Sequence, residues 1–385
     1  MLHILGTATL GFVTFFWIVT TIDIARGVLS VPSVQDAEPL QDSDCPFVSI
    51  LFAGRDEAQK LPEALPTFLA LDYPRYEVIA ADDRSQDDTG SILKNAAQKD
   101  ARLKVVHIAS LPPGWLGKPH ALQQAYEQSN GEWLVFTDAD VHFEPDLLRR
   151  AIALAKKHHW EHLTLFGAPK TFTFGEKLIM TFFGLAFLMG TRPWAANNPR
   201  SRGYTGVGAF QMVRRSAYEK MGTHKRLAME VIDDMKLGKL AKDAGILSGV
   251  AKAGNAVSVH WHAGLGNTIR GTTKNFFAAS QFKISLTIAQ VLGLLLVFVF
   301  PLVALPFVHG WARLLAALSF GLPILLGVGV ALEFKTTVIY ALTLPIGAVI
   351  FTWMLARSAI ITLWQGGIVW RGTFYPLEEL KRGIV

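Results

Sequence analysis

The chain has 385 residues, of which 51% are hydrophobic and 18% charged, and its mean hydropathy is +0.31. These values exceed those of ordinary soluble proteins and predict membrane insertion. The formal net charge is +6, yet the sequence has no run of five or six basic residues, which argues against a nucleic-acid partner. Basic residues flanking membrane helices explain the charge better. The single cysteine, Cys45, excludes an intramolecular disulfide and fits a reducing compartment.

The N-terminal 25 residues are predicted to form a transmembrane anchor. The stretch 4–22 lacks charge and is long enough to cross about 30 Å of hydrocarbon. A cleaved signal peptide is the alternative, but it fits less well because residues 1–6 contain no Lys or Arg. Residues 26–45, rich in Pro, Asp and Gln towards their end, are predicted to form a linker.

Residues 284–370 are predicted to form a C-terminal transmembrane region, followed by a tail at 371–385. Three apolar runs fill this region, at 284–308, 312–332 and 337–356, and each is long enough to cross. Lys274 and Lys283 precede the first run, which predicts that the preceding domain is cytoplasmic in a multi-pass protein of a bacterial inner membrane. Three crossings would leave the basic tail on the opposite side. Either the positive-inside rule is broken, or one run is re-entrant or lies flat.

Residues 46–280 alternate between strand-like and helix-like segments, so we expect an α/β domain. Short apolar runs predict buried parallel strands, and helical stretches follow them. Strands are expected at 47–53, 76–81, 103–108 and 133–140, and helices at 58–71, 88–99, 119–129 and 145–158. Repeated βα units imply a parallel sheet covered on both faces, with ligands at the carboxyl ends of its strands. The apolar segment 176–190 is short for a span. It is either a buried helix or, preferably, an interfacial helix.

Two acidic pairs follow predicted strands. Asp82 and Asp83 are adjacent carboxylates that repel each other unless something uses them, and they could accept hydrogen bonds from a base or ribose. The neighbouring Asp87, Asp88 and Thr89 (in QDDTG) are better explained as a helix cap.

The second pair, in FTDAD, is Asp138 and Asp140. Side chains alternate along an extended chain, so both carboxylates should share one face. Such a pair suits a hard divalent cation, which prefers oxygen ligands. A cation that also holds a diphosphate would neutralise the leaving group. An Asp-x-Asp triplet alone is a weak signal, and its position after an apolar strand strengthens it.

Asp233 and Asp234 form a third acidic pair and are expected to open a helix. One of them could simply favour the helix dipole. The functional hypothesis makes Asp234 a base that removes the proton of an attacking acceptor hydroxyl.

Basic and small residues complete the candidate site. Lys118 could neutralise a diphosphate, and Gly206 and Gly208 would let the backbone approach a ligand closely. Arg270 and Lys274 could bind either diphosphate or lipid headgroups. The histidines of 157–162 and 259–262 lack a fourth ligand or a helical His-x-x-x-His spacing, which argues against zinc.

The order of the motifs FAGRDE, ADDRS, GWLGK, FTDAD, GVGAF, IDD and KN, followed by apolar runs, resembles family 2 glycosyltransferases with the GT-A fold. The resemblance covers about residues 46–280 and extends to the flanking helices. It is strongest to bacterial hopanoid-associated and carotenoid glycosyltransferases, with WRGTFY at 370–375 similar to a tail motif of the latter. Ceramide glucosyltransferase is more distant.

The resemblance implies a role for each motif. Glu57 and Asp83 would contact the nucleotide base, with Asp82 beside them, and Lys118 would contact the nucleotide or its phosphates. Asp138 and Asp140 would hold Mn²⁺ or Mg²⁺. The residues that would border the sugar and acceptor are Gly208, Ala209 and Phe210. Asp234 would be the base, with Asp233 where the family usually has Glu.

The QxxRW motif of processive family members is missing, which disfavours polymer synthesis. The resulting hypothesis is an inverting transfer of one hexose from a nucleotide-diphosphate sugar, a UDP-sugar by preference, to a lipid hydroxyl. A polyprenyl-phosphate sugar transferase is the alternative enzyme. A nucleotide-binding membrane scaffold or transport protein is the non-enzyme alternative.

Overall fold

The computed structural model describes residues 2–385, with side chains from residue 5 onward. Met1, the first residue of the expected anchor, lies outside the described residues. The chain divides into two compact units. The α/β unit comprises residues 31–170, 193–260 and 369–385, and the helical unit comprises residues 2–30, 171–192 and 261–368.

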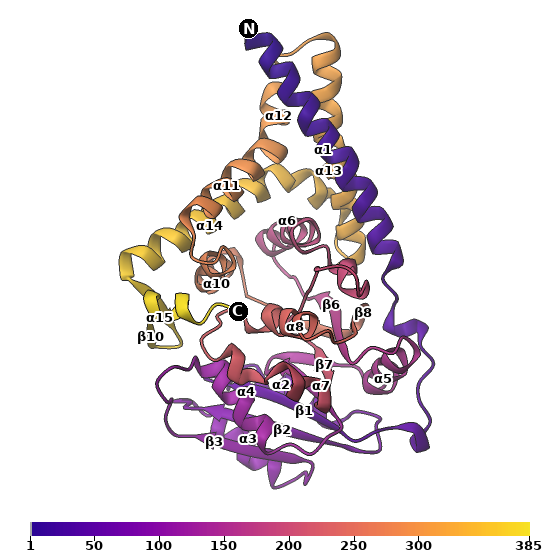
Figure 1. The fold of residues 1–385 in the computed structure, drawn as a ribbon, viewed down its shortest axis with the longest axis vertical. Helices are drawn as coiled ribbons and strands as arrows, with labels where there is room; N and C mark the ends of the chain where they lie inside the picture. The colour runs from indigo at the N-terminus through magenta and orange to yellow at the C-terminus, as the bar shows by residue number, and fades with distance from the viewer. Residues whose placement is uncertain (1) are drawn as a thin grey trace. The chain divides into compact units, whose positions relative to one another are not determined.

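A mixed sheet with strand order β3-β2-β1-β4-β7-β6-β8-β5 forms the centre of the α/β unit (Figure 1). The first four strands along the chain are mutually parallel, as the sequence predicted. They are β1 (Val48–Gly54), β2 (Tyr76–Asp83), β3 (Leu103–Ile108) and β4 (Trp133–Asp138). The sheet continues through β7 (Gln211–Arg214), antiparallel to its neighbours, then β6 (His162–Pro169), β8 (Ser248–Val259) and β5 (Val141–Phe143).

Helices cover both faces of this sheet, because side chains of a strand alternate between them. In β1, Phe52 packs on Phe68 of α2 (Leu61–Leu69), while Leu51 belongs to the cluster on the other face that contains residues of α4 (Gly117–Glu127). Between residues 61 and 243, the α-helices of the unit are α2 (Leu61–Leu69), α3 (Thr89–Ala97), α4 (Gly117–Glu127), α5 (Leu147–Lys157), α7 (Arg215–Met221) and α8 (Asp233–Asp243). The four expected between 58 and 158 are confirmed within a few residues at each end, and so is the helix that Asp233 opens.

The local structure of the two strand-end acidic pairs differs from the expectation. β2 extends through both Asp82 and Asp83, whereas β4 ends at Asp138 and a turn follows. The prediction that Asp138 and Asp140 share one face of an extended chain is therefore wrong. The chain must turn here because the three-residue strand β5 begins at Val141 and pairs antiparallel to β8.

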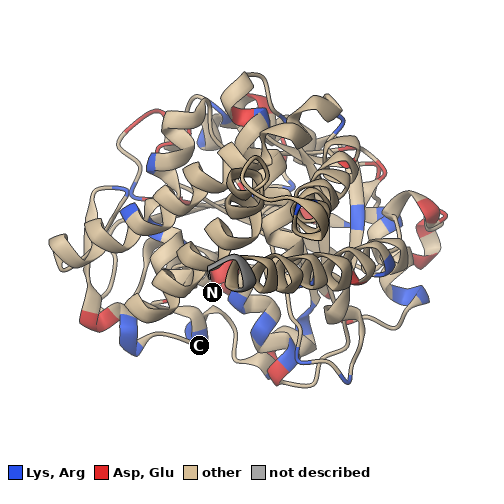
Figure 2. Cartoon of the chain, turned by 90° about the horizontal axis from the view of Figure 1, so that it is seen from above, with Lys and Arg blue, Asp and Glu red and all other residues tan. Residues whose placement is uncertain are grey.

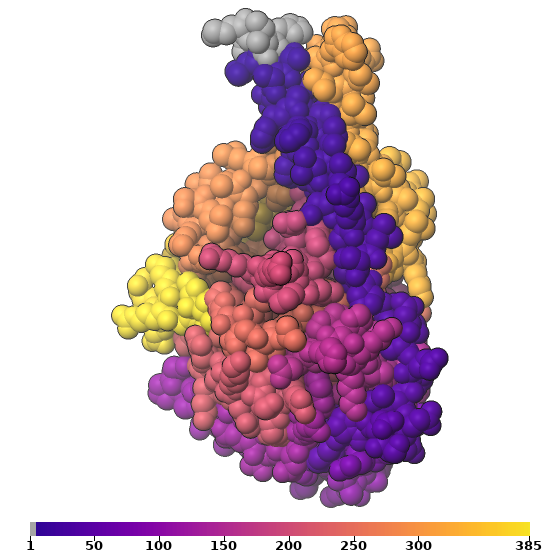
Figure 3. All heavy atoms as spheres, turned by 45° about the vertical axis from the view of Figure 1, so that its right-hand side comes forward, coloured from indigo at the N-terminus to yellow at the C-terminus, as the bar shows by residue number. Residues whose placement is uncertain are grey.

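The helical unit contains α1 (Leu2–Ser30) and the interrupted helix α11 (Ile284–Leu294) to α12 (Phe300–Ala304), with a π-helical turn between them. α13 (Gly310–Glu333) packs along α1 (Figure 3). The hydroxyls of Thr14 and Ser319 hydrogen-bond at 2.8 Å, and the Trp17 indole donates to the Val297 carbonyl at 2.9 Å. Such bonds link apolar helices where lipid offers no competing partner. α6 (Phe174–Thr191), α9 (Leu265–Gly271), α10 (Thr273–Ala279) and α14 (Leu344–Gln365) complete this unit.

Five helical stretches among the described residues are long and apolar enough to cross a membrane: 5–30, 174–197, 284–304, 310–333 and 338–365. Charged residues are sparse within these stretches; Figure 2 colours the positions of Lys, Arg, Asp and Glu along the whole described chain. Four of the stretches coincide with the predicted anchor and the three C-terminal runs. The fifth contains the segment for which the sequence favoured an interfacial helix.

Residues 371–385, which the sequence analysis expected to form a C-terminal tail, contain regular secondary structure. The chain here forms a hairpin of β9 (Gly367–Trp370) and β10 (Thr373–Pro376), followed by α15 (Leu377–Arg382). Leu377 and Leu380 are buried, and residues 369–385 belong to the α/β unit. The predicted boundary at residue 371 stays a prediction.

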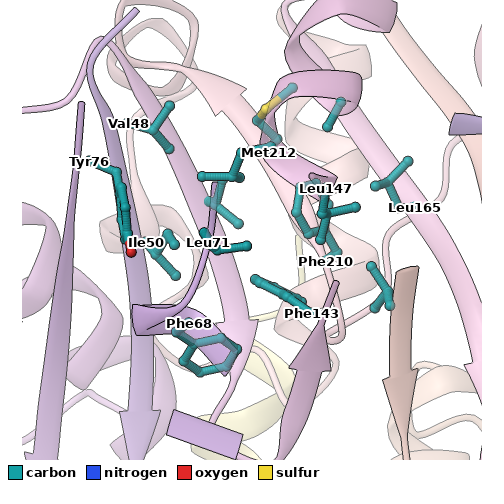
Figure 4. Packing of buried hydrophobic residues seen from close by; sticks show 14 of the residues in the cluster. Val48, Ile50, Phe68, Leu71, Tyr76, Phe143, Leu147, Leu165, Phe210 and Met212 are labelled. Carbon is teal, nitrogen blue, oxygen red and sulfur yellow. The ribbon is translucent and has the colours of Figure 1, made fainter. Parts of the chain in front are cut away.

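The packing of Phe68 in the core of the α/β unit can be tested by mutation. Phe68 is fully buried between Phe52 and Phe143, with ring centroids 5.6 and 4.9 Å away (Figure 4 shows Phe68 and Phe143). Phe68→Ala should lower the free energy of unfolding by about 3–5 kcal/mol, because the cavity cannot fully collapse. Leu247→Ala, at a side chain 43% exposed, should change it by less than about 0.5 kcal/mol. Urea titration of the purified protein measures both, and equal effects would contradict this packing.

Candidate active site

Acidic residues meet at one edge of the sheet, where the parallel strands end. The strand register pairs Gly54 of β1 with Asp82 of β2, and Ala53 of β1 with Asp138 of β4. Glu57 follows β1 by three residues. The first two acidic pairs of the sequence are therefore brought to one edge, as expected for carboxyl ends of parallel strands.

Lysines neutralise the Asp-x-Asp motif. The Lys118 ammonium lies 2.6 Å from Asp138 and 3.8 Å from Asp233, so it links the second and third acidic pairs. Burial by itself lowers the pKa of Lys118, but Asp138, Asp233 and Asp234 outweigh it and hold that pKa well above its usual range. Lys60 contacts Asp140 at 2.5 Å. The carboxylates of Asp138, Asp233 and Asp234 therefore favour the charged form of Lys118 at the centre of the site.

The glycine-rich loop before β7 lies close to the carboxylates of both Asp138 and Asp234. The Gly208 amide donates to Asp234 Oδ2 at 2.9 Å, and a Cβ at Gly208 would lie 2.5 Å from Asp138 Oδ2. A Cβ at Gly206 would lie 2.0 Å from the Asp234 carbonyl oxygen. Side chains are excluded at both positions because the protein's own acidic residues approach the loop backbone closely.

Ala209 and Phe210 were expected to border the sugar and acceptor. The Ala209 carbonyl accepts a hydrogen bond from Thr137 at 2.8 Å. Phe210 is fully buried and packs on Phe143, with ring centroids 5.5 Å apart (Figure 4). The expectation for Phe210 is therefore wrong for its side chain, which supports the site from the core and does not line it.

A hydrogen-bonded chain behind Asp234 was missed by the sequence analysis. The Gln211 amide donates to the Asp234 carbonyl at 3.0 Å, and its oxygen lies 3.1 Å from His162 Nε2. Burial lowers the pKa of His162 to about 4, so the ring is neutral at pH 7. His162 was weighed only as a zinc ligand, because no pattern in the sequence links it to Gln211.

Glu57, Asp82 and Asp83, the residues expected to contact the nucleotide, form the candidate nucleotide end of the site. Two of them are paired with arginines. Asp82 and Asp83 are buried, and the Arg84 guanidinium binds both Asp83 oxygens at 2.7 and 2.9 Å. Glu57 is paired with Arg371 of the tail. Burial raises the pKa of Glu57, and Arg371 partly opposes this. Arg371 was assigned no role by the sequence analysis, where WRGTFY was noted only as a tail motif.

Arg270 and Lys274 belong to the helical unit. Arg270 donates to Asn267 at 2.7 Å, and Lys274 donates to the neighbouring Asn275 at 2.9 Å. Their role at a nucleotide-sugar stays a prediction.

The acidic residues were tested for their fit to a divalent cation. The described residues contain no group of three or more His, Cys, Asp or Glu side chains able to hold a metal ion. Mg²⁺ and similar cations are often held by only one or two carboxylates together with substrate phosphates. Asp138 and Asp140 fit that kind of site, in which the substrate supplies the remaining oxygens.

Comparison with known proteins identifies similar domains. Residues 49–222 match the model of glycosyl transferase family 2. A beta-monoglucosyldiacylglycerol synthase of Trichormus variabilis is 34% identical over 134 residues, which are 30% of this chain and 28% of that protein. An undecaprenyl-phosphate 4-deoxy-4-formamido-L-arabinose transferase of Pseudomonas savastanoi is 34% identical over 115 residues, 29% of this chain and 33% of that protein. The chain thus spans about a third or less of these two relatives.

Among solved structures, the mannosyltransferase PcManGT of Pyrobaculum calidifontis, in complex with GDP-Man and Mn²⁺, covers 94% of this chain and 99% of its own. The TM-score is 0.54 at 18% identity, which supports a common fold. The structure therefore has a GT-A-like fold. Residues 49–222, which make up less than half of the chain, are similar to the domains of glycosyl transferase family 2.

The neutral state of His162 predicts a pH dependence. In the unfolded chain a histidine takes up a proton near pH 6.5, but in the fold His162 does so only near 4. The unfolded state therefore binds more protons between these values. Stability should fall as the pH falls from about 6.5 towards 4, by up to about 1.4 kcal/mol per pH unit from this group.

His162→Gln should remove this part of the slope, because glutamine keeps a donor for Gln211 and does not titrate. His159→Asn, at an exposed position, should keep the wild-type slope. Urea titrations between pH 4 and 7 measure the difference, and an unchanged slope in His162→Gln would show that His162 is not held neutral.

Proposed function

We propose that this protein is an inverting glycosyltransferase that moves one hexose from a nucleotide-diphosphate sugar to a membrane lipid hydroxyl. The observation that carries the proposal is the placement of Lys118 between Asp138 and Asp233, with Asp234 on the same short helix end. One cation thereby touches both the predicted diphosphate end and the predicted base end of the site.

The proposed reaction is a single displacement. The acceptor oxygen forms a bond to the anomeric carbon, the bond from that carbon to the diphosphate breaks, and the hydroxyl proton passes to Asp234. The Gly208 amide and Gln211 hold Asp234 in place, which favours reaction by positioning the base. Lys118 stabilises the negative charge that develops on the leaving diphosphate. Mn²⁺ or Mg²⁺ held by Asp138 and Asp140 would add positive charge against the same group.

The lipid acceptor is supported by relatives whose names specify lipid products or substrates, glucosyldiacylglycerol and undecaprenyl phosphate. A 4,4'-diaponeurosporenoate glycosyltransferase of Staphylococcus haemolyticus also matches, at 24% identity over 56% of this chain and 55% of that protein. We propose a UDP-sugar as the donor. Undecaprenyl phosphate in one relative's name keeps a polyprenyl phosphate as the second candidate acceptor.

Chain connectivity supports a membrane topology for the helical unit. β6 precedes α6 and β7 follows it, and these strands pair in one sheet, so both ends of α6 return to the α/β unit. A crossing α6 would put two neighbouring strands on opposite sides of the bilayer. We therefore propose that α6 lies along the membrane interface.

The same reasoning applies to the C-terminal runs. Residue 260 and residues 369–385 belong to the α/β unit, so an even number of crossings must separate them. We propose that α11–α12 and α13 cross as a pair beside α1, and that α14 does not cross. α14 packs on α6, where Phe351 lies 5.3 Å from Phe182, and on α10, where Ser358 accepts from the Phe277 amide. This leaves the basic tail on the cytoplasmic side with the domain.

Asp234→Asn should lower sugar transfer to a lipid hydroxyl by about 10²–10⁴-fold, because the amide cannot take the proton. Asp243→Asn is the matched control, since Asp243 ends the same helix and its side chain is 54% exposed. Mass spectrometry of lipids from membranes supplied with donor measures the product. The added mass gives the sugar, and the parent ion gives the acceptor.

Full activity of Asp234→Asn on a lipid hydroxyl would contradict the proposed base. A largely active variant whose product is a polyprenyl-phosphate sugar would favour the second candidate, since that acceptor is already anionic.

The topology predicts which side of the membrane each segment faces. In a Cys45→Ser background, single cysteines replace Ser91, His309 or Lys381, all at exposed positions. In intact spheroplasts, a membrane-impermeant maleimide should label only the variant at 309, in the turn between α12 and α13. After lysis it should label all three. Labelling of the variant at 381 in intact spheroplasts would show an odd number of crossings.

A further inference from the structure

The tail hairpin ends in a turn of unusual backbone. Arg371 and Gly372, its central residues, both have positive φ, 49° and 75°. Two-residue hairpin turns of this kind favour Asn and Gly, and other residues pay a conformational cost there. An arginine that occupies a strained position points to a role for its side chain.

Contacts within the α/β unit fix this hairpin beside the candidate nucleotide end. Tyr375 is buried, and its hydroxyl accepts the Gly117 amide at 3.3 Å, next to Lys118. On the same strand, Thr373 accepts a bond of 3.4 Å from Arg55. The hairpin is therefore attached both to the chain that follows β1 and to the start of α4.

The Arg371 guanidinium lies between the candidate nucleotide residues and solvent. It contacts Glu57, whose side chain is 16% exposed, while that of Arg371 is 43% exposed. Asp140 is close enough to raise the pKa of Glu57 electrostatically, although burial is the larger cause. Glu57 is thus influenced both by Arg371 and by Asp140 of the Asp-x-Asp motif. A guanidinium has five N–H donors in a planar fork, so it can hold one carboxylate and an oxyanion together.

We propose that Arg371 is a donor-binding residue that contacts the diphosphate of the nucleotide-sugar, with the hairpin 369–376 as a wall of the donor site. Tyr375 is the positioning residue that holds the hairpin against α4. This inference rests on the proposed function, because it assigns a residue to the nucleotide-sugar of that reaction. It gives the tail a role in binding that lies outside the matched family domain.

The test is calorimetric titration of UDP with Mn²⁺ into the purified full-length protein, with GDP titrated in parallel. Arg371→Ala should weaken nucleotide binding about 10-fold to 100-fold, as expected for the loss of a charge-assisted hydrogen bond. Arg371→Gln, which keeps hydrogen bonding to Glu57 without the charge, should weaken it similarly, and Arg371→Lys should retain part of the affinity. Lys381→Ala removes a cation of similar exposure (42%) from the same tail and should bind like wild type.

Kinetics separate a donor role from a structural one. In Arg371→Gln, the KM for the donor should rise at least tenfold, while the KM for the acceptor and the midpoint of thermal unfolding stay within error of wild type. Tyr375→Phe should raise the donor KM by a smaller factor. Wild-type nucleotide affinity in both Arg371→Ala and Arg371→Gln would overturn the inference and leave the proposed function intact. Absence of nucleotide binding by the wild type would instead contradict the proposed function.

Discussion

Repulsion between carboxylates crowded at one sheet edge is the constraint on which the α/β unit depends. Asp82, Asp83 and Asp138 lie at one sheet edge because parallel strands end side by side, and Lys118 connects Asp138 to Asp233 at the start of α8. Buried like charges are costly unless cations or hydrogen bonds balance them. The chain supplies such cations from four different elements or loops, as Lys60, Arg84, Lys118 and Arg371.

This balance links structure and proposed chemistry. Lys118 holds together two acidic pairs that would otherwise repel each other, and in the proposed reaction its charge stabilises the leaving diphosphate. The glycines before β7 let the backbone approach Asp138 and Asp234 without a side chain between them. Gln211 and His162 then fix the helix end that carries Asp234. A site built in this way is preorganised, because its charged groups are held before the substrate arrives.

Chain connectivity supports a proposal on a question that hydropathy left open. Counting apolar runs gave three C-terminal crossings and an awkward position for the basic tail. The tail belongs to the α/β unit, and this is the basis of our proposal that an even number of crossings separates residues 260 and 369. Hydropathy measures only length and composition, and it does not report whether the two ends of a helix return to the same folded sheet.

The sequence by itself determined the α/β class, the early strands, the helix opened by Asp233 and the three acidic pairs. These features depend on local alternation of apolar residues and on short motifs, which a single sequence records. Tertiary structure alone decided that Asp140 lies in a turn, that Phe210 belongs to the core, and that Lys118 bridges Asp138 and Asp233. It alone brought Arg371 to Glu57, residues separated by more than 300 positions. Such contacts arise from packing between distant segments, and no local pattern of residues encodes them.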